Sequence, residues 1–242
     1  LMQPIVSLAA AAVVHSSFME ERVAEVFKGP ILRLFLPRDQ KAAPSKTEIE
    51  RWKAATASKE RCQFATFGHV NRAKCLDTII MAFGQSQKLK AGAQLVIAGR
   101  PDDKEYIREI EPLVTKLGLT KQVTFEYGVT NNRLLAIKND TDVFLNLRYP
   151  NTEGASGSLI EMMNAARPVI AYRAGCYADM PDDAVVFIER MDGLDAVVRA
   201  MEDLMSNPAR RIEIGAAASA HLVKQDSARY VRNLKKFVLD TQ

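Results

Sequence analysis

Two carboxylates near the middle of the chain flank a run of small residues. Glu153 and Glu161 stand eight residues apart, and residues 154–157 read Gly-Ala-Ser-Gly. Small residues let backbone N–H groups approach a ligand closely, and the N–H groups at a helix N-terminus bind phosphate. Carboxylates only accept hydrogen bonds, which suits the hydroxyls of sugars. Together these groups predict a site for a ligand with a diphosphate and sugars, which is a nucleotide sugar.

The loop after a predicted strand at 64–67 could hold the phosphates. Gly68 permits unusual backbone angles, and Arg72 and Lys74 could neutralise phosphate oxygens. His69 could donate a hydrogen bond to a diphosphate. The simpler interpretation is a solvated turn with Lys74 on the helix surface, and the two glutamates would then be ordinary surface carboxylates.

Other common sites are not indicated. No GxGxxG follows a predicted strand and no Walker A motif occurs, so a nicotinamide dinucleotide or P-loop site is not expected. His15, His69 and His221 lack the spacing of a catalytic triad or a zinc site, so we expect no metal. The three cysteines are odd in number and have no CxxC spacing, which favours reduced thiols and a cytoplasmic location.

Charge and hydropathy narrow the class of protein. The 242 residues are 48% hydrophobic, which is ample for a buried core, and the net charge is +4 with a pI near 8.9. The basic residues are scattered, so nucleic acid is not an expected partner, whereas an anionic small ligand or a membrane surface suits the charge. No apolar run reaches the ~20 residues that span a bilayer, and the start lacks the basic segment of a signal peptide. Because Leu precedes Met there, we expect a piece of a longer protein.

The elements that would position these residues alternate regularly from Gln63 onward. Apolar runs rich in β-branched or aromatic residues predict strands at 64–67, 95–98, 123–127, 143–147, 169–171 and 185–188. Helices are predicted between and after them at 76–89, 104–117, 132–138, 157–165, 194–206, 208–223 and 227–239. Near-continuous apolar strands separated by helices predict an α/β fold, a Rossmann-like parallel sheet with helices on both faces.

The residues in front of this pattern form a separate group. They predict a strand at 11–15, a helix from Ser16 or Ser17 to Phe27, and a strand at 31–36. Residues 37–44 are polar and bracketed by prolines, which is typical of a linker. Ser45 and Glu48 then predict a capping box for a helix that ends near residue 57.

Ligands of an open parallel sheet bind outside the carboxyl ends of its strands. The segments at those ends are 68–74, 99–100, 128–129, 148–157 and 174–175. Several of their residues are glycines or cations, including Arg100 and Arg148. This is the distribution that a phosphate-bearing ligand needs.

Five segments resemble the carboxyl half of the group 1 glycosyltransferases. In order they are FGHVNRAKCLDTIIMAF, QLVIAGRPD, LGLTKQVTFEYGVT, TDVFLNLRYPNTEGASGSLIE and ARPVIAYRAGCYADMPDD. The resemblance covers residues 62 to 200, and its most specific part is the pair Glu153 and Glu161 followed by Pro-Val-Ile. It implies the donor-binding domain of a GT-B fold and retaining, metal-independent transfer from a UDP- or GDP-linked sugar, with no separate cofactor.

The resemblance also implies roles for single residues. Glu161 resembles the glutamate that holds the ribose hydroxyls, Glu153 the catalytic one near the donor sugar, and Lys74 the phosphate-binding lysine. Arg100 and Val129 lie on loops that flank the base. The backbone amides expected to face the diphosphate and sugar belong to Gly154, Ala155, Ser156, Gly157 and Ser158.

Three positions depart from the family's pattern. His69 stands where arginine is frequent, so phosphate binding is expected to depend more on Lys74 and Arg72. Ala155 stands where an aromatic residue is usual. Ala166-Arg167 replaces the glycine before the Pro-Val-Ile strand, so the preceding helix is expected to end without an easy left-handed residue.

The resemblance gives a domain division and a function. Residues 1–36 are expected to be a remnant of an amino-terminal acceptor domain, 37–61 a linker and helix, and 62–242 the donor-binding domain with its terminal helices. The expected acceptor is a glycan, a lipid or a small molecule, and the missing acceptor half could contact a membrane. Two alternatives stay open at this point. They are a nucleotide-binding module of the same fold without catalysis, and a nucleotide-sugar epimerase.

Overall fold

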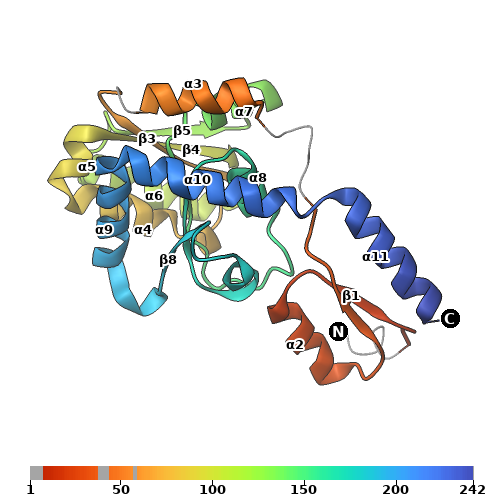
Figure 1. Ribbon diagram of the computed structural model, residues 1–242. Coiled ribbons are helices and arrows are strands. Elements are labelled where there is room, and N and C mark those ends of the chain that lie inside the picture. The colour runs from red at the N-terminus through yellow and green to blue at the C-terminus, as the bar shows by residue number, and fades with distance from the viewer. Residues whose placement is uncertain (1–7, 38–43, 57–58, 242) are drawn as a thin grey trace.

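The computed structural model describes residues 8–37, 44–56 and 59–241, and its main body is built on one parallel sheet (Figure 1). The sheet has six strands in the order β5-β4-β3-β6-β7-β8, and every neighbouring pair is parallel. The strands are β3 (Cys62–His69), β4 (Ala93–Arg100), β5 (Val123–Tyr127), β6 (Val143–Asn146), β7 (Val169–Tyr172) and β8 (Val186–Ile188). The predicted α/β fold is therefore confirmed.

Helices cover both faces of this sheet. They are α4 (Leu76–Gln85), α5 (Gln87–Gly92), α6 (Lys104–Lys116), α7 (Asn131–Asp140), α8 (Gly157–Asn164), α9 (Gly193–Ser206) and α10 (Pro208–Val223). Side chains of α4, α5, α6 and α9 pack in one hydrophobic cluster, and those of α7, α8 and most of α10 pack in the other.

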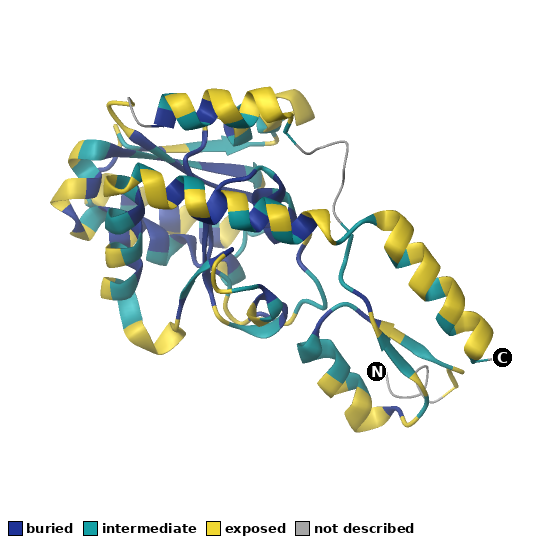
Figure 2. Ribbon diagram, viewed as in Figure 1, coloured by how far each residue is buried: buried dark blue, intermediate teal, exposed yellow. Residues whose placement is uncertain are grey.

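Alternation along each strand divides the apolar side chains between these two clusters. Phe64, Val143 and Leu145 lie in the first cluster, and Ala65 and Phe144 lie in the second. All five are fully buried, as is every residue of β6 and β7, and dark blue in Figure 2 is concentrated in the main body. Burial on both faces explains why these strands read as continuous apolar runs rather than as alternating ones.

A small unit precedes this body. Strand β1 (Ala12–Val14), helix α2 (Ser17–Val26) and strand β2 (Ile31–Arg33) form a parallel two-stranded β-α-β unit, and Ser16 caps the helix. The terminal helix α11 (Ser227–Asp240) runs beside this unit rather than beside the main sheet (Figure 1), and the rings of Tyr230 and His15 lie 5.9 Å apart. Residues far apart in the chain thus meet in this unit.

Three expectations need correction. The helix predicted at 76–89 is two helices, because Ser86 is extended and its hydroxyl caps the second one at Leu89. The strand predicted at 31–36 is shorter, because β1 offers only three residues as partners, and Phe35 and Leu36 instead pack against the second cluster.

The third correction concerns the end of α8. Ala166 has a φ of 56°, so a left-handed residue does end this helix although it is not glycine. Gly215 of α10 lies directly beneath it, where a Cβ would come within 2.3 Å of the Ala166 carbonyl oxygen. The glycine that the sequence lacks at this helix end is thus matched by one on the facing helix, which lets the turn approach closely.

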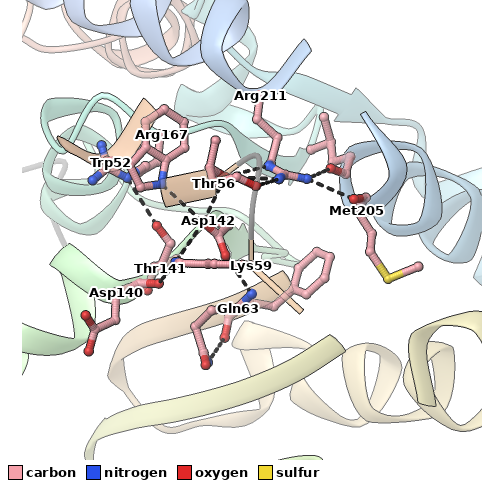
Figure 3. A network of polar contacts seen from close by, with 12 residues as sticks. Trp52, Thr56, Lys59, Gln63, Asp140, Thr141, Asp142, Arg167, Met205 and Arg211 are labelled. Atoms are coloured by element: carbon pink, nitrogen blue, oxygen red, sulfur yellow. Dashed lines mark hydrogen bonds and ion pairs between the residues drawn. The ribbon is translucent and has the colours of Figure 1, made fainter. Parts of the chain in front are cut away.

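Helix α3 (Lys46–Thr56) is joined to the body by a buried polar network (Figure 3). The predicted capping box is confirmed, since Ser45 N–H donates to Glu48 at 2.7 Å and Glu48 N–H donates to the Ser45 hydroxyl at 3.2 Å. Asp142, fully buried before β6, accepts hydrogen bonds from Trp52, Thr56, Lys59 and the backbone of Gln63 at 2.9–3.2 Å. The predicted end of α3 at residue 57 and much of the predicted linker lie outside the described residues.

Arginines complete this network from two other elements. Arg211 of α10 donates to the hydroxyl and carbonyl of Thr56 and to two carbonyls at the end of α9. The guanidinium of Arg167 lies 3.9 Å from the ring centroid of Trp52. Burial lowers the pKa of Arg167 to about 10, with Asp142 opposing that shift. The network anchors α3 at the sheet edge opposite the strand ends that carry the candidate site.

Candidate functional site

Glycines bring the ends of three strands close together at the carboxyl edge of the sheet. Gly68 and Gly99 are register partners with φ values of 121° and 148°. A Cβ on Gly99 would lie 1.8 Å from the Gly68 carbonyl oxygen, so no other residue fits there. Gly128 follows β5 with a φ of 65° and donates its N–H to Gly99 at 2.9 Å. The strand ends thus present bare backbone.

A pocket of about 460 Å³ opens over this backbone. Its lining joins the three glycine turns to the start of α8, and its residues are Phe67, Gly68, His69, Gly99, Arg100, Gly128, Val129, Leu134, Gly157, Ser158 and Glu161. Two larger or comparable hollows lie elsewhere, one along β8 and α10 and one between α3 and α10. Neither contains the predicted residues, so the pocket at the carboxyl edge is the candidate site.

Lys74 lies beneath the pocket as a buried cation. It ends the turn Arg72–Lys74 and is 5% exposed, and its Nζ donates to Asn146 Oδ1 at 2.9 Å and to Ser158 Oγ at 3.1 Å. Burial and the charge of Arg148 lower the pKa of Lys74 to about 8, against the opposing charge of Glu153. The interpretation of Lys74 as a surface residue is therefore wrong.

Glu161 lines the pocket from the helix that begins at the loop's end. Its carboxylate accepts from Lys138 Nζ at 2.8 Å, and the Lys138 ammonium also lies 5.4 Å from the Phe67 ring centroid. Ser156 caps this helix by accepting from Leu159 N–H. The first two helical residues, Gly157 and Ser158, line the pocket, and N–H groups at this position have no acceptor within the helix. A carboxylate and a helix N-terminus thus share one cavity, as predicted.

Glu153 lies apart from this lining, on the loop that faces α2. One of its oxygens forms an ion pair with Arg148, 2.9 Å from Nη2, and its side chain is one-third exposed. The next residue, Gly154, accepts a hydrogen bond from Ser16 at 2.8 Å. Ala155 and Ser156 line a small hollow against the front unit instead of the main pocket. The structure thus places the loop 153–156 between the pocket and the β1-α2-β2 unit.

The remaining predicted cations have acidic partners. Arg72 is exposed and donates to both oxygens of Glu109 at 2.7 and 2.6 Å, which raises the pKa of Arg72 and lowers that of Glu109. His69 and Arg100 both pair with Asp102, the latter at 3.4 Å. His69 and Arg100 still line the pocket, whereas the structure turns Arg72 away from it.

Four residues whose side chains hold the predicted site residues in place were not identified from the sequence. Asn146 and Lys138 hold the two functional side chains, and Asp102 and Glu109 hold the cations. The sequence does mark Asn146, because it is a polar residue inside the apolar run Val-Phe-Leu-Asn-Leu. Nothing in the sequence marks Asp102 and Glu109, because they lie 33 and 37 residues from His69 and Arg72, the residues with which they pair.

Metal-binding clusters and membrane-spanning helices are both absent from the part of the chain that the structure describes. Among residues 8–37, 44–56 and 59–241, no three His, Cys, Asp or Glu side chains come together as a metal site would require. No helix described there is both long enough and apolar enough to cross a bilayer.

Comparison with known families decides the classification. The model of the family described as "Glycosyl transferases group 1" matches residues 48–221. This chain belongs to the group 1 glycosyltransferases. The match covers most of α3, the whole six-stranded sheet and nearly all of α10, so it includes every residue of the pocket.

Solved structures give this group 1 chain the same fold. Sucrose-phosphate synthase from Thermosynechococcus elongatus matches 99% of it at 19% identity and a TM-score of 0.78. HepE from Anabaena, in complex with UDP-glucose, matches 97% at 13% identity and a TM-score of 0.79. The C-terminal domain of LpcC from Francisella tularensis matches 76% at 21% identity and a TM-score of 0.62. The predicted GT-B type of fold is confirmed.

The group 1 chain spans only part of the full-length proteins among these. It covers 61% of the sucrose-phosphate synthase chain and 64% of the HepE chain, but 95% of the LpcC domain. A comparison with curated proteins found no significant match.

Proposed function

We propose that this chain binds the donor of a retaining glycosyltransferase, a sugar linked to a nucleoside diphosphate. The observation that carries the proposal is the pocket at the carboxyl edge, where Lys74, the start of α8 and the Glu161 carboxylate converge. A buried cation and helix N–H groups suit phosphates, and a carboxylate suits hydroxyls. The complex of HepE with UDP-glucose supports this choice, since that protein has the same fold.

The residues divide the ligand between them. Glu161 accepts hydrogen bonds from the ribose hydroxyls, and the turns at Gly99 and Val129 flank the base. Lys74 and the amides of Gly157 and Ser158 hold the diphosphate. Glu153, on the loop beside α2, faces the donor sugar and is the catalytic residue, on the side of the pocket from which the acceptor approaches. This division places the nucleotide deep in the pocket and the sugar near the front unit.

Transfer proceeds in this proposal without a metal ion or another cofactor. The leaving diphosphate gains negative charge in the transition state, and preorganised cations and N–H groups stabilise that charge in place of a metal. The proposed acceptor is a glycan, a lipid or another small molecule, and the proposed compartment is the cytoplasm.

Titration calorimetry with UDP, GDP and UDP-glucose tests the donor site. Wild-type protein should bind at least one of the two nucleotides, and Glu161→Ala should lose most of that affinity because the ribose hydroxyls lose their acceptor. Glu105→Ala, an exposed glutamate on α6, serves as the control and should bind as the wild type does. Equal affinities of the Glu161 and Glu105 variants would contradict the proposed site.

A binding module without catalysis is the second candidate. The pairing of His69 with Asp102 and of Arg72 with Glu109 favours it, because these residues are engaged away from a phosphate. Product analysis with UDP-glucose separates the two functions. Release of UDP and formation of a glycoside with an added acceptor support the transferase, whereas binding without any turnover supports the module.

A further inference from the structure

Lys74 supplies one positive charge beneath the candidate phosphate site. A nucleoside diphosphate carries at least two negative charges near neutral pH. Lys74 is held by the neutral groups of Asn146 and Ser158, so its charge is available to a ligand. Arg72 and His69, which the strand-end loop offers, are held by carboxylates. A second cation for the diphosphate is therefore best sought on another element.

Arg148 is a cation on another element that lies near Lys74. It lies two residues beyond β6, at the same edge of the sheet as the pocket, and its side chain is 15% exposed. It lies close enough to Lys74 that its charge helps to lower the pKa of that lysine. The two cations thus share a small, poorly solvated volume with one carboxylate, that of Glu153, so the cluster keeps a net positive charge that an anionic ligand would offset.

The ion pair of Arg148 with Glu153 is incomplete. Only Nη2 of the arginine contacts the carboxylate, through one oxygen at 2.9 Å. Among the described residues, Nε of Arg148 and Oε2 of Glu153 are both buried without a hydrogen-bond partner. A guanidinium commonly binds a carboxylate or a phosphate through two parallel hydrogen bonds. Arg148 and Glu153 each keep unused hydrogen-bonding capacity in a buried setting, where leaving it unused is unfavourable.

We propose that Arg148 is the second phosphate-binding cation, held by Glu153 in the free protein and transferred to the diphosphate when the donor binds. This inference rests on the proposed function. The exchange lets the two cations share the charge of the two phosphates. It also frees the Glu153 carboxylate, which can then accept hydrogen bonds from the donor sugar. Glu153 thus becomes available only when a diphosphate is present.

The exchange predicts opposite effects for the two partners of the ion pair. Arg148→Gln should weaken UDP binding by about tenfold to a hundredfold, the value of one charge-assisted contact, and leave uridine binding unchanged. Glu153→Gln should strengthen UDP binding, because the arginine no longer has to leave a carboxylate. Arg148→Lys should retain part of the affinity, and Arg72→Gln, the matched control, should bind UDP as the wild type does.

Calorimetry with UDP, GDP and uridine on these variants distinguishes the possible outcomes, and circular dichroism confirms that each is folded. Equal weakening by Arg148→Gln and Glu153→Gln would mean that the ion pair only supports the loop, and would overturn the exchange. Wild-type UDP affinity in Arg148→Gln would overturn it too. If Arg148→Gln does not fold, the rise in affinity of Glu153→Gln decides alone. Wild-type protein that binds neither UDP nor GDP would instead refute the proposed function.

Discussion

The buried charge of Lys74 is proposed to bind the diphosphate, and the same charge lowers the stability of the folded protein. Replacing Lys74 by methionine should therefore change ligand affinity and stability in opposite directions. The ammonium is 5% exposed and has two neutral hydrogen-bond acceptors, Asn146 and Ser158. Methionine is an unbranched side chain of similar length, so Lys74→Met removes the charge with little change in shape. We expect the variant to be more stable near pH 7 and to have lost the diphosphate part of its affinity.

The magnitude follows from the pKa. Burial, helped by the charge of Arg148, lowers the pKa of Lys74 from its ordinary 10.5 to about 8. A change of this size corresponds to about 3 kcal/mol against the charged form in the folded protein. The methionine variant loses two hydrogen bonds, which is worth about 1–2 kcal/mol. The difference leaves Lys74→Met about 1–2 kcal/mol more stable near pH 7.

The sign of the pH dependence is the decisive part. Between pH 8 and 10.5 the unfolded chain holds the lysine proton while the folded protein has released it, so wild-type stability rises with pH through this window. The penalty is fully present below pH 8 and is relieved as pH rises toward 10.5. The variant has no such group. Its advantage should therefore shrink above pH 8, by about 1.4 kcal/mol for each pH unit, and reverse near pH 9.

Urea unfolding of both proteins at pH 7, 8, 9 and 10 measures the difference, with Lys121→Met as the control for loss of an exposed lysine. The control should follow the wild type at every pH. A Lys74→Met variant that is less stable at pH 7, by an amount that does not change with pH, would refute the reasoning. It would mean that the ammonium is not desolvated in the folded protein.

Two other substitutions test the pocket and its support. Gly157→Ala adds a methyl group where nothing lies within 4 Å, so it should change stability by less than about 0.5 kcal/mol. It should nevertheless weaken UDP binding measured by calorimetry, because the methyl group occupies pocket space; unchanged affinity would place the ligand elsewhere. Asp142→Ala should cost about 3–5 kcal/mol in urea unfolding, since a buried carboxylate with four donors is lost. A loss below about 1 kcal/mol would show that the network does not anchor α3.

The sheet was predictable because burial determines its sequence pattern. Strand β5 has the predicted bounds, and the other five strands of the main sheet lie within two residues of them or extend further, as β3 and β4 do. Helix α10 also has its predicted bounds, since Pro208 starts it. A continuous apolar run between helical patterns identifies a strand reliably when helices cover both faces of the sheet. The two short strands of the front unit lack such a pattern, and there the prediction for residues 31–36 was too long.

Local breaks were harder to predict, because single residues cause them. Ser86 divides a helical pattern that continues in its apolar positions, and Ala166 adopts a left-handed φ that its side chain disfavours. Contacts with other elements accompany both breaks: the Ser86 hydroxyl donates to Glu202 of α9 at 2.6 Å, and Ala166 packs on α10. Gly215 permits the turn at Ala166, and it lies 49 residues further along the chain. No local pattern connects these two positions.

The candidate site was predictable in its location but not in its charges. Strand-end glycines, Lys74 and the two glutamates mark the carboxyl edge, and the structure gathers Gly68, Glu161 and their neighbours around one pocket. The ion pairs join elements that are distant in sequence. Hence Arg72, expected to bind phosphate, contacts Glu109, and Arg148, given no specific role by its position, lies beside Lys74. Side-chain pairing across elements depends on the folded arrangement.

Asn146 shows why these charges matter for function rather than for the fold. It occupies the last position of β6, is fully buried, and would be replaced by an apolar residue if packing alone determined the sequence. Its amide oxygen instead accepts a hydrogen bond from Lys74, and its amide nitrogen donates to Ser158 at 3.4 Å. The role of Asn146 is thus to provide a hydrogen-bond acceptor for the buried ammonium. That ammonium is itself unfavourable in the free protein. A polar residue that supports an unfavourable charge, at the edge of the sheet where ligands bind, is best explained by an anion that the charge receives.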